Sequence, residues 1–316
     1  MSRVTTLQPG QAPASSLPTT WERLDDRFAE VDGDAQVVRI ASGCRWAEGG
    51  TYLPASRSFV WSDIPNDRLL RWDELTGSVG VFRSPAAYPN GSTIDGQGRL
   101  VTCEHGGRRV RRTEHDGSTT VLVDTFEGRR FNSPNDVVVD SQGRVWFTDP
   151  SYGISTDYEG FAAESEIGGN HVYRLDVDGS CHQVTDDFDQ PNGLAFSRDE
   201  SQLYVVDSER HHLRVFDVTP DGALTGGAVL AECTAGTFDG VRLDSTGRIW
   251  AAAHDGVHCL DPDGTLLGKL LLPEKCANLV FSGLKRNLLL VCATTSVYAV
   301  MLKVTGAPGV HGAGRA

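Results

Sequence analysis

The architecture of this chain is clearest in the segment Phe131-Asn132-Ser133-Pro134-Asn135-Asp136-Val137-Val138-Val139-Asp140-Ser141-Gln142-Gly143-Arg144-Val145-Trp146-Phe147-Thr148-Asp149-Pro150. It contains two short runs rich in β-branched and aromatic residues, Val137 to Asp140 and Val145 to Asp149, separated by the turn formers Ser141-Gln142-Gly143. The segment therefore predicts a β-hairpin with both open ends on the same side. Asn135-Asp136 and Thr148-Asp149 would then meet at one rim of a sheet.

The same arrangement of a polar lead residue, an apolar run, a turn and a second apolar run recurs along the chain. Strong copies begin at Asn90, Asn192 and Asp239, and weaker ones begin at Glu48 and Asn278. Successive lead residues of the six units are 42, 45, 57, 47 and 39 positions apart. Six units of this length predict an all-β fold, a six-bladed β-propeller.

Each unit also contains a second hairpin, most clearly around the turn Asp178-Gly179. Comparable turns occur at Asp116-Gly117, Asp221-Gly222 and Asp263-Gly264, which favours four strands per blade. The last unit lacks one strand, whereas the strand-like run Gln36 to Ile40 precedes the first unit. We expect this run to complete the last blade, so that an N-terminal strand closes the ring.

The region before the first unit is predicted to be an arm. Met1 to Thr20 is rich in Pro, Ser and Gln and lacks the apolar core of a signal peptide or membrane anchor. Trp21 to Val31 is the one segment with helical periodicity. We therefore predict an N-terminal arm with a short helix (1–33), a single propeller domain (34–304) and a C-terminal tail (305–316).

Charge and cysteine content exclude some classes of function. A net charge of -13 argues against nucleic-acid binding, which needs a basic face. The basic cluster Arg108, Arg109, Arg111 and Arg112 is interpreted as a solvent-exposed outer strand. Seven scattered cysteines without CxxC spacing are expected to be reduced thiols in a cytoplasmic protein.

In a propeller, the residue that leads each innermost strand lies at the mouth of the central channel. Two lead residues are the carboxylates Glu48 and Asp239, whose mutual repulsion is costly unless a cation or a proton offsets it. The amide oxygens of Asn135 and Asn192 can complete an oxygen-only site for one divalent cation, Ca²⁺ first, with Mg²⁺, Mn²⁺ or Zn²⁺ as alternatives. Weaker candidates for the same ring are Asn90 and Asn278.

Four parts of the sequence resemble the gluconolactonase family, which includes senescence marker protein and luciferin-regenerating enzyme. They are Glu48-Gly49, Ser133-Pro134-Asn135-Asp136 with Phe147-Thr148-Asp149-Pro150, Pro191-Asn192-Gly193 and Phe238-Asp239-Gly240. The similarity extends roughly from Ala41 to Val300.

This resemblance implies a six-bladed propeller with one divalent cation in its channel, and hydrolysis of sugar lactones. Carried over residue by residue, it places Glu48, Asn135, Asn192 and Asp239 at the metal. One departure is Gly50, which stands where the family usually has Pro and makes the backbone beside Glu48 less constrained.

The expected chemistry is metal-assisted hydrolysis. A cation that binds the lactone carbonyl would stabilise the oxyanion that forms when water attacks. Asp239 is the candidate general base or proton carrier, provided that one of its oxygens stays free for water. Water bound to the cation is the alternative nucleophile.

Substrate contacts are expected from side chains around the channel mouth. The candidates for substrate binding are Asn90, His105, Arg130 and Tyr152. The long connection from Ser151 to Gly169 is a candidate lid, with a merely variable loop as the alternative. Further contacts are expected from the ends of the second strands, at Asp63, Glu104, Asp149, Asp207 and His254.

Two other functions remain open at the level of sequence. A phosphotriesterase-like hydrolase could use the same kind of cation site, and a non-catalytic propeller could serve as a binding scaffold. The two carboxylates Glu48 and Asp239 count against the second alternative, because a scaffold has no need of them.

Overall fold

The hairpin predicted around Ser141-Gln142-Gly143 is formed by strands β14 (Val137–Val139) and β15 (Val145–Asp149), which pair antiparallel with Val138 opposite Trp146. In the computed structural model, which describes residues 15–33 and 36–308, two more strands extend this hairpin. They are β16 (Asn170–Leu175) and β17 (Cys181–Phe188), so the sheet has four antiparallel strands.

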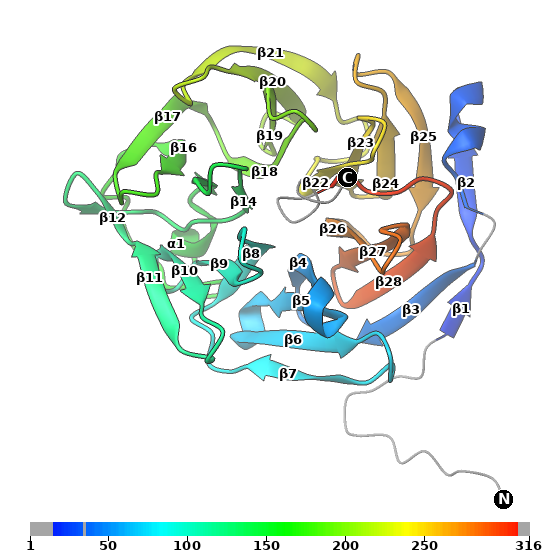
Figure 1. Cartoon of the computed structure of the whole chain (residues 1–316), viewed down its shortest axis with the longest axis horizontal. Helices are drawn as coiled ribbons and strands as arrows, with labels where there is room; N and C mark the ends of the chain where they lie inside the picture. The colour runs from blue at the N-terminus through cyan, green and yellow to red at the C-terminus, as the bar shows by residue number, and fades with distance from the viewer. Residues whose placement is uncertain (1–14, 34–35, 309–316) are drawn as a thin grey trace, which may run out of the picture.

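Sheets of the same construction surround a central axis as the blades of a ring (Figure 1). The prediction of a six-bladed β-propeller is confirmed in the described part of the chain. The first blade consists of β4 (Ala47–Leu53), β5 (Ser58–Asp63), β6 (Arg68–Asp73) and β7 (Val79–Arg83). The second consists of β8 (Pro89–Ile94), β9 (Leu100–Glu104), β10 (Arg109–Thr113) and β11 (Thr119–Val123).

The hairpin blade is the third in the ring, and three more blades follow it. The fourth consists of β18 (Pro191–Phe196), β19 (Gln202–Asp207), β20 (His212–Val218) and β21 (Leu224–Glu232). The fifth contains β22 (Val241–Leu243), β23 (Ile249–Ala253), β24 (Gly256–Leu260) and β25 (Leu266–Leu271). The sixth contains β26 (Cys276–Ser282), β27 (Leu288–Ala293) and β28 (Ser296–Met301).

An N-terminal strand closes the ring, as predicted. Strand β3 (Val37–Ser42) pairs antiparallel with β28, with Val297 opposite Ala41, and so supplies the fourth strand of the sixth blade. Strand β1 (Ser15–Leu17) then adds to the outer edge of β3. The first and last parts of the described chain are therefore held in one sheet.

The helical prediction for Trp21 to Val31 is wrong in its first part. Residues Thr20–Arg23 form strand β2, which pairs with β25 of the fifth blade, and a 3-10 helix, η1 (Asp26–Glu30), follows it. The outer edge of β25 would otherwise leave backbone groups unpaired, and strand pairing satisfies them. The periodicity reflects two buried contacts, Phe28 and Val31, whereas Leu24 is exposed.

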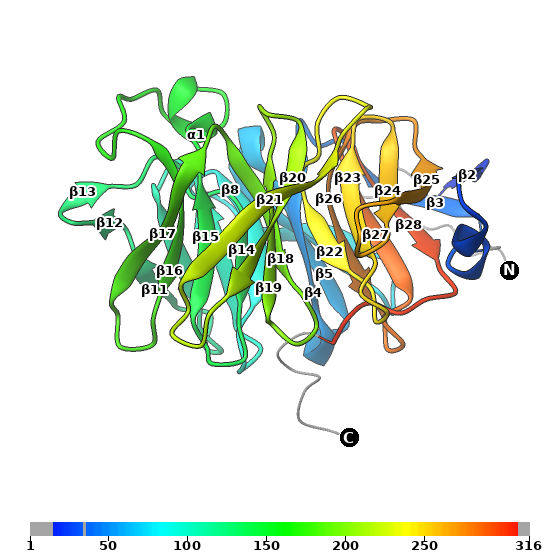
Figure 2. The same ribbon diagram turned by 90° about the horizontal axis from the view of Figure 1, so that it is seen from above.

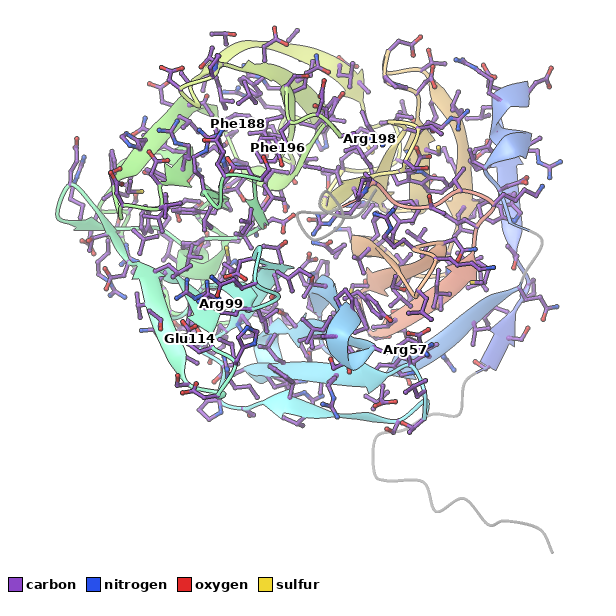
Figure 3. All side chains as sticks on the ribbon, in the orientation of Figure 1. Arg57, Arg99, Glu114, Phe188, Phe196 and Arg198 are labelled. Carbon is purple, nitrogen blue, oxygen red and sulfur yellow. The ribbon has the colours of Figure 1, made fainter. Side chains whose placement is uncertain are left out.

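The hydrophobic core lies between neighbouring blades. One cluster joins the third and fourth blades through Trp146, Val172, Phe188, Leu203 and Phe216. Phe196 packs edge-on against Trp146, and Figure 3 labels Phe188 and Phe196 in this region of the ring. Turns between the strands of a blade carry charged side chains, as in the ion pair between Arg99 and Glu114 at 3.2 Å, also labelled in Figure 3.

Little regular structure lies outside the blades. A small hairpin joins β12 (Thr125–Phe126) to β13 (Arg129–Arg130), the short helix α1 (Tyr152–Ser155) follows β15, and two 3-10 turns, η2 (Pro54–Ser56) and η3 (Ile64–Asn66), flank β5. In the side view, α1 and its loop lie at one face of the ring (Figure 2). Within the described residues, none of the helices has the length and apolar character needed to cross a bilayer.

The cysteines are single thiols. Each of the seven is free, and six of them are buried. Burial raises the pKa of Cys44 to about 12 and that of Cys292 well above its usual range, so these thiols stay protonated. They act as small apolar side chains in the core.

Candidate functional site

A β-bulge stands at the start of the inner strands. In four blades, the register between the innermost strand and its neighbour shifts at the lead residue. In the third blade, Asn135 N–H donates to the Thr148 carbonyl, and Thr148 N–H donates to the carbonyl of the next residue, Asp136. Asp239 and Gly240 face Ala252 in the same way. Two residues thus oppose one, and such a bulge redirects the side chains at its position.

The glycine after a lead residue allows neighbouring inner strands to approach closely. A Cβ on Gly91 would lie 2.4 Å from the Asn135 carbonyl oxygen, and one on Gly193 would lie 2.2 Å from the Asp239 carbonyl oxygen. A Cβ on Gly240 would meet the Asn278 side chain at 2.6 Å. These Asn-Gly and Asp-Gly pairs therefore serve close packing around the axis, and the lead residues of adjacent blades become direct neighbours.

Glu48 is a buried carboxylate at the start of the innermost strand of the first blade. Its side chain is buried, and Oε1 accepts hydrogen bonds from the Asn278 amide at 2.8 Å and from Gly49 N–H at 3.0 Å. Oε2 is buried without a hydrogen-bond partner among the described residues. Burial raises the pKa of Glu48 to about 7, although both hydrogen bonds oppose the shift.

Asp239 is half-buried and lies close enough to Glu48 to be affected by its charge. Desolvation raises the pKa of Asp239 well above its usual range, and the charge of Glu48 raises it further. Two carboxyl groups that each disfavour ionisation of the other form a site that a cation or a proton would stabilise. The sequence analysis expected such repulsion between these two residues.

Asp136 is a buried channel residue that the sequence analysis left without a role. Its carboxylate accepts from its neighbour Val137 N–H at 2.9 Å, and Arg242 Nη1 lies 3.4 Å from its other oxygen. Arg242 offsets the charge of Asp136, whereas no such cation contacts Glu48 in the described structure. The signal was present in the third unit, where Asp136 stands in place of the glycine that follows four of the other lead residues.

Asn90 and His105 form one buried unit. Asn90 Nδ2 lies 3.0 Å from His105 Nε2, and His105 Nδ1 lies 3.2 Å from the Glu159 carbonyl oxygen. Asn90 Oδ1 is buried and has no hydrogen-bond partner among the described residues. Burial lowers the pKa of His105 to about 4, so the imidazole is neutral near pH 7.

Asn135 and Asn192 are the lead residues of the third and fourth blades. Asn135 is buried, and its backbone carbonyl accepts from Gly91 N–H at 2.7 Å. Asn192 Nδ2 donates to Ser208 Oγ at 3.0 Å, and this hydroxyl donates to the Phe238 carbonyl at 3.0 Å. Because its nitrogen is engaged, the Asn192 amide presents its oxygen on the opposite side.

The connection after β15 packs onto the mouth of the channel. Gly153 N–H donates to Ser133 Oγ at 2.9 Å, and a Cβ on Gly153 would lie 2.5 Å from that of His105. Phe161 packs edge-on against Tyr88 of the second blade. These contacts hold the candidate lid segment against residues of the second and third blades.

Two side chains of this loop point toward the site. The hydroxyl of Tyr152 lies beside Ser208 and Asn192; burial and the charge of Asp239 raise its pKa above the usual range, while these two neighbours lower it. Glu159 is half-buried, and its charge raises the pKa of both Glu48 and Asp239. Sequence reasoning named Tyr152 but missed Glu159, because an irregular loop offers no periodic signal.

Arg130 is not brought to the other predicted site residues. It lies in β13, where its side chain is exposed, its backbone N–H donates to Glu166 and Nη2 donates to the Gly107 carbonyl at 3.4 Å. The β12–β13 hairpin stands at the outer edge of the ring, away from the axis (Figure 1). Closeness to Asn135 in sequence does not bring Arg130 to the channel.

The residues at the ends of the second strands of the blades were expected to contact the substrate. In the structure, three of the carboxylates among them bind backbone N–H groups of loops instead. Asp63 accepts from Arg45 N–H at 2.9 Å, Asp149 accepts from the N–H groups of Asn132 and Ser133, and Asp207 accepts from those of Asp189 and Gln190. Each of these buried carboxylates thus binds the backbone just before a lead residue. The last predicted residue of this group, His254, lies beside Thr237 with a nitrogen-to-oxygen distance of 3.4 Å.

The remaining strand end, Glu104 of the second blade, explains the basic cluster. Its two oxygens lie 2.6 Å from Arg109 Nε and 3.0 Å from Arg111 Nε, while Arg108 is buried and donates to the Phe131 carbonyl. Arg112 pairs with Glu114 at 2.8 Å. The interpretation of these arginines as a solvent-exposed outer strand is therefore wrong, since they belong to a partly buried ion-pair network.

The lead residues offer oxygen donors that suit a hard cation. In the described part of the chain, no three His, Cys, Asp or Glu side chains are grouped so as to hold a metal ion. A cation would therefore need amide oxygens besides carboxylates. The free Glu48 Oε2, the half-buried Asp239 carboxylate and the asparagine amides provide such a donor set, which fits Ca²⁺ better than a soft metal. Asn278 is unsuited, because its amide donates to Glu48 and its oxygen accepts from Leu279 N–H.

Comparison with known proteins finds relatives that are similar over most of the chain. Gluconolactonase of Zymomonas mobilis is 30% identical over 90% of this chain and 85% of its own length. Pentonolactonase XacC of Haloferax volcanii is 32% identical over 78% of this chain and 81% of its own length. The solved structure of a gluconolactonase from Xanthomonas campestris matches with a TM-score of 0.88 and 35% identity, covering 94% of this chain and 99% of that one. The model of the SMP-30/gluconolactonase/LRE-like region matches residues 46–295, and the chain belongs to this family.

Proposed function

We propose that this chain is a divalent-metal-dependent hydrolase that opens a sugar lactone. The observation that carries the proposal is the pair of carboxyl groups at the channel mouth, Glu48 and Asp239, whose pKa values are both raised by burial. The names of the relatives, gluconolactonase and pentonolactonase, support lactones as the substrate class.

In this proposal, Glu48 Oε2, Asp239 and the amide oxygens of Asn135 and Asn192 hold the cation, and Ca²⁺ is the preferred ion. Bound there, a divalent cation supplies a Lewis acid for the lactone carbonyl. Asn278 holds Glu48 in place through its 2.8 Å hydrogen bond. The buried Asn192 keeps its orientation through Ser208.

Asp239 is proposed to take the proton from the attacking water. It is half-buried, whereas Glu48 is only 4% exposed, so water reaches Asp239 more readily. Burial and the charge of Glu48 raise the pKa of Asp239 in the metal-free protein, and a bound cation would offset this shift. Asp239 is therefore proposed as a base through an oxygen that stays free of the cation.

Substrate hydroxyls are proposed to bind groups that close around the mouth. Asn90 Oδ1 accepts no hydrogen bond from the residues that the structure describes, and the Tyr152 hydroxyl from the lid loop lies beside Asn192 and Ser208. Both are therefore placed to contact a polyhydroxylated ring bound near Asp239. The loop over the mouth would exclude bulk water from that ring.

The proposal is tested by removing metal with a chelator and assaying hydrolysis after adding back Ca²⁺, Mg²⁺, Mn²⁺ or Zn²⁺ separately. The assay uses aldonolactones of five- and six-membered ring size and, in parallel, an organophosphate triester. Loss of lactone hydrolysis on chelation and its recovery with a divalent ion would support the proposal. Turnover of the triester alone would favour the phosphotriesterase alternative, and full activity in chelator would remove the cation from the mechanism.

A further inference from the structure

The amide of Asn90 has one orientation that its surroundings can satisfy. The Glu159 carbonyl can only accept, so the 3.2 Å contact with His105 requires a hydrogen on Nδ1. In a neutral imidazole Nε2 is then an acceptor, and the Asn90 group 3.0 Å away must be the NH₂. Oδ1 therefore lies on the side away from His105, where it is buried without a partner among the described residues.

The reverse orientation would be costly. If Oδ1 faced His105, Nε2 would also need a hydrogen, and the ring would become an imidazolium. His105 is 0% exposed, and its two nitrogens meet only Asn90 and the Glu159 carbonyl among the hydrogen bonds of the described residues. Burying a cation without a carboxylate partner carries a large desolvation penalty. Both ring nitrogens are thus occupied, which leaves His105 no free group for a substrate.

We propose that His105 is a positioning residue, which turns the Asn90 amide so that Oδ1 is presented as an acceptor to a hydroxyl of the bound lactone. This inference rests on the proposed lactonase function. The lid loop takes part through Glu159, whose carbonyl selects the tautomer of His105. A lid carbonyl, a histidine and an asparagine from the second blade thus form one chain of hydrogen bonds that ends at the channel mouth.

Two substitutions at His105 separate this role from simple packing. His105→Gln places an acceptor oxygen near the position of Nε2, whereas His105→Asn is too short to reach Asn90 and retains a donor only near Nδ1. We expect kcat/KM for D-glucono-1,5-lactone to fall roughly tenfold in His105→Asn, the size of effect of one lost hydrogen bond, and to stay within about threefold of wild type in His105→Gln. Ca²⁺ affinity, measured by calorimetry, should be unchanged in both.

A double-mutant cycle tests whether His105 acts through Asn90. In an Asn90→Ala background, His105→Asn should cause no further loss of kcat/KM, because the group that it positions is gone. An equal loss in both backgrounds, or a similar loss in the Gln and Asn variants, would overturn the proposal. A fall in Ca²⁺ affinity in His105→Asn would do the same, since it would place Asn90 Oδ1 on the cation instead of the substrate.

One measurement needs neither a variant nor activity. NMR of wild-type protein carrying ¹⁵N-labelled histidine should show the His105 proton on Nδ1 at neutral pH. A proton on Nε2 would overturn the inference even if the protein hydrolyses lactones. If the protein has the expected tautomer but hydrolyses no lactone, the proposed function fails, and with it the part of the inference that concerns a substrate hydroxyl.

Discussion

The Asn278 amide donates a 2.8 Å hydrogen bond to Oε1 of Glu48, although 230 positions separate the two residues in the chain. This contact joins the inner strand of the last blade to that of the first, beside the closure of the ring. The two oxygens of the Glu48 carboxylate therefore differ. Oε1 accepts this hydrogen bond, whereas Oε2 has no hydrogen-bond partner among the described residues. Asn278 is thus placed to orient Glu48 rather than to bind a cation.

Asn278→Ala is expected to weaken Ca²⁺ binding by roughly 10- to 100-fold, the usual cost of removing a group that orients a metal ligand. Glu48 would keep its charge but lose one of the hydrogen bonds that fix Oε1. Calorimetric titration of the metal-free variant would measure the change. Asn66→Ala is a matched control, because Asn66 donates to the structural carboxylate of Asp63 at 2.8 Å; its Ca²⁺ affinity should equal that of wild type. Equal affinities in all three proteins would contradict the assigned role.

Asp239→Asn should separate the metal-binding role of Asp239 from its role as a base. The variant keeps an oxygen donor but cannot take a proton, so it should remain about 10² to 10⁴-fold slower than wild type even at saturating cation. Asn135→Ala removes only a neutral donor, and excess cation should recover part of its rate. Steady-state rates over a range of Ca²⁺ concentrations would measure both.

The control for Asp239→Asn is Asp255→Asn. Asp255 lies in the same blade but pairs with Lys269 at 3.0 Å and with His258 at 2.7 Å. Its loss should lower stability modestly and leave kcat unchanged. Near-native turnover of Asp239→Asn at high cation would show that Asp239 is a ligand only.

The stabilisation by Ca²⁺ should increase with pH. The pKa of Glu48 is raised by burial from 4.5 to about 7, so the metal-free fold is favoured by protonated Glu48, and this stability is lost as the pH rises from about 4.5 to about 7. Ca²⁺ binds the ionised form of Glu48. As the pH falls below the pKa of this carboxyl group, the affinity for Ca²⁺ should fall roughly tenfold per pH unit for each proton that the ion displaces. The gap in Tm between Ca²⁺ and chelator should therefore widen from about pH 5 to about pH 8.

Glu48→Gln provides the control for this pH dependence. Burial also raises the pKa of Glu104 to about 7, so the metal-free protein keeps a pH-dependent stability that does not involve the site. Only the difference between Ca²⁺ and chelator reports on the channel. In Glu48→Gln that difference should be small and should vary much less with pH. A constant Tm gap in wild type would contradict a role for Glu48 in cation binding.

The repeat pattern was sufficient to predict the fold, because every blade repeats the alternation of apolar runs and turns. It also placed the lead residues Glu48, Asn135, Asn192 and Asp239 around one axis. The missing strand of the last unit correctly indicated closure by β3. These features are periodic, and periodicity can be read without knowing which distant residues are in contact.

Features that depend on distant contacts were not predictable in the same way. Strand β2 forms because β25, far along the chain, offers an unpaired edge, which outweighs a weak helical pattern. Glu159 reaches the site because its loop binds His105. Arg130 follows a local hairpin away from the axis. Asp149 and Asp207 were misjudged for a related reason, since their backbone partners lie in loops without a pattern.

Gly193→Ala tests whether close approach between inner strands sets the geometry of the site. The new Cβ would lie 2.2 Å from the Asp239 carbonyl oxygen and 2.7 Å from the Gly240 Cα, and backbone atoms cannot rotate away. Overpacking of this kind costs about 1–3 kcal/mol, which urea denaturation would measure. Because the displaced atoms belong to Asp239 and its neighbour, Ca²⁺ affinity should fall as well.

Gly80→Ala is the matched control. Gly80 lies in the outer strand β7, and a Cβ there would meet nothing within 4 Å. This variant should be as stable as wild type or slightly more stable, by up to about 1 kcal/mol, because alanine restricts the unfolded chain. It should also bind Ca²⁺ as wild type does. If Gly193→Ala matched Gly80→Ala in stability and in Ca²⁺ affinity, the inner strands would tolerate an extra methyl group. The spacing of the lead residues would then have to be set by the bulges instead.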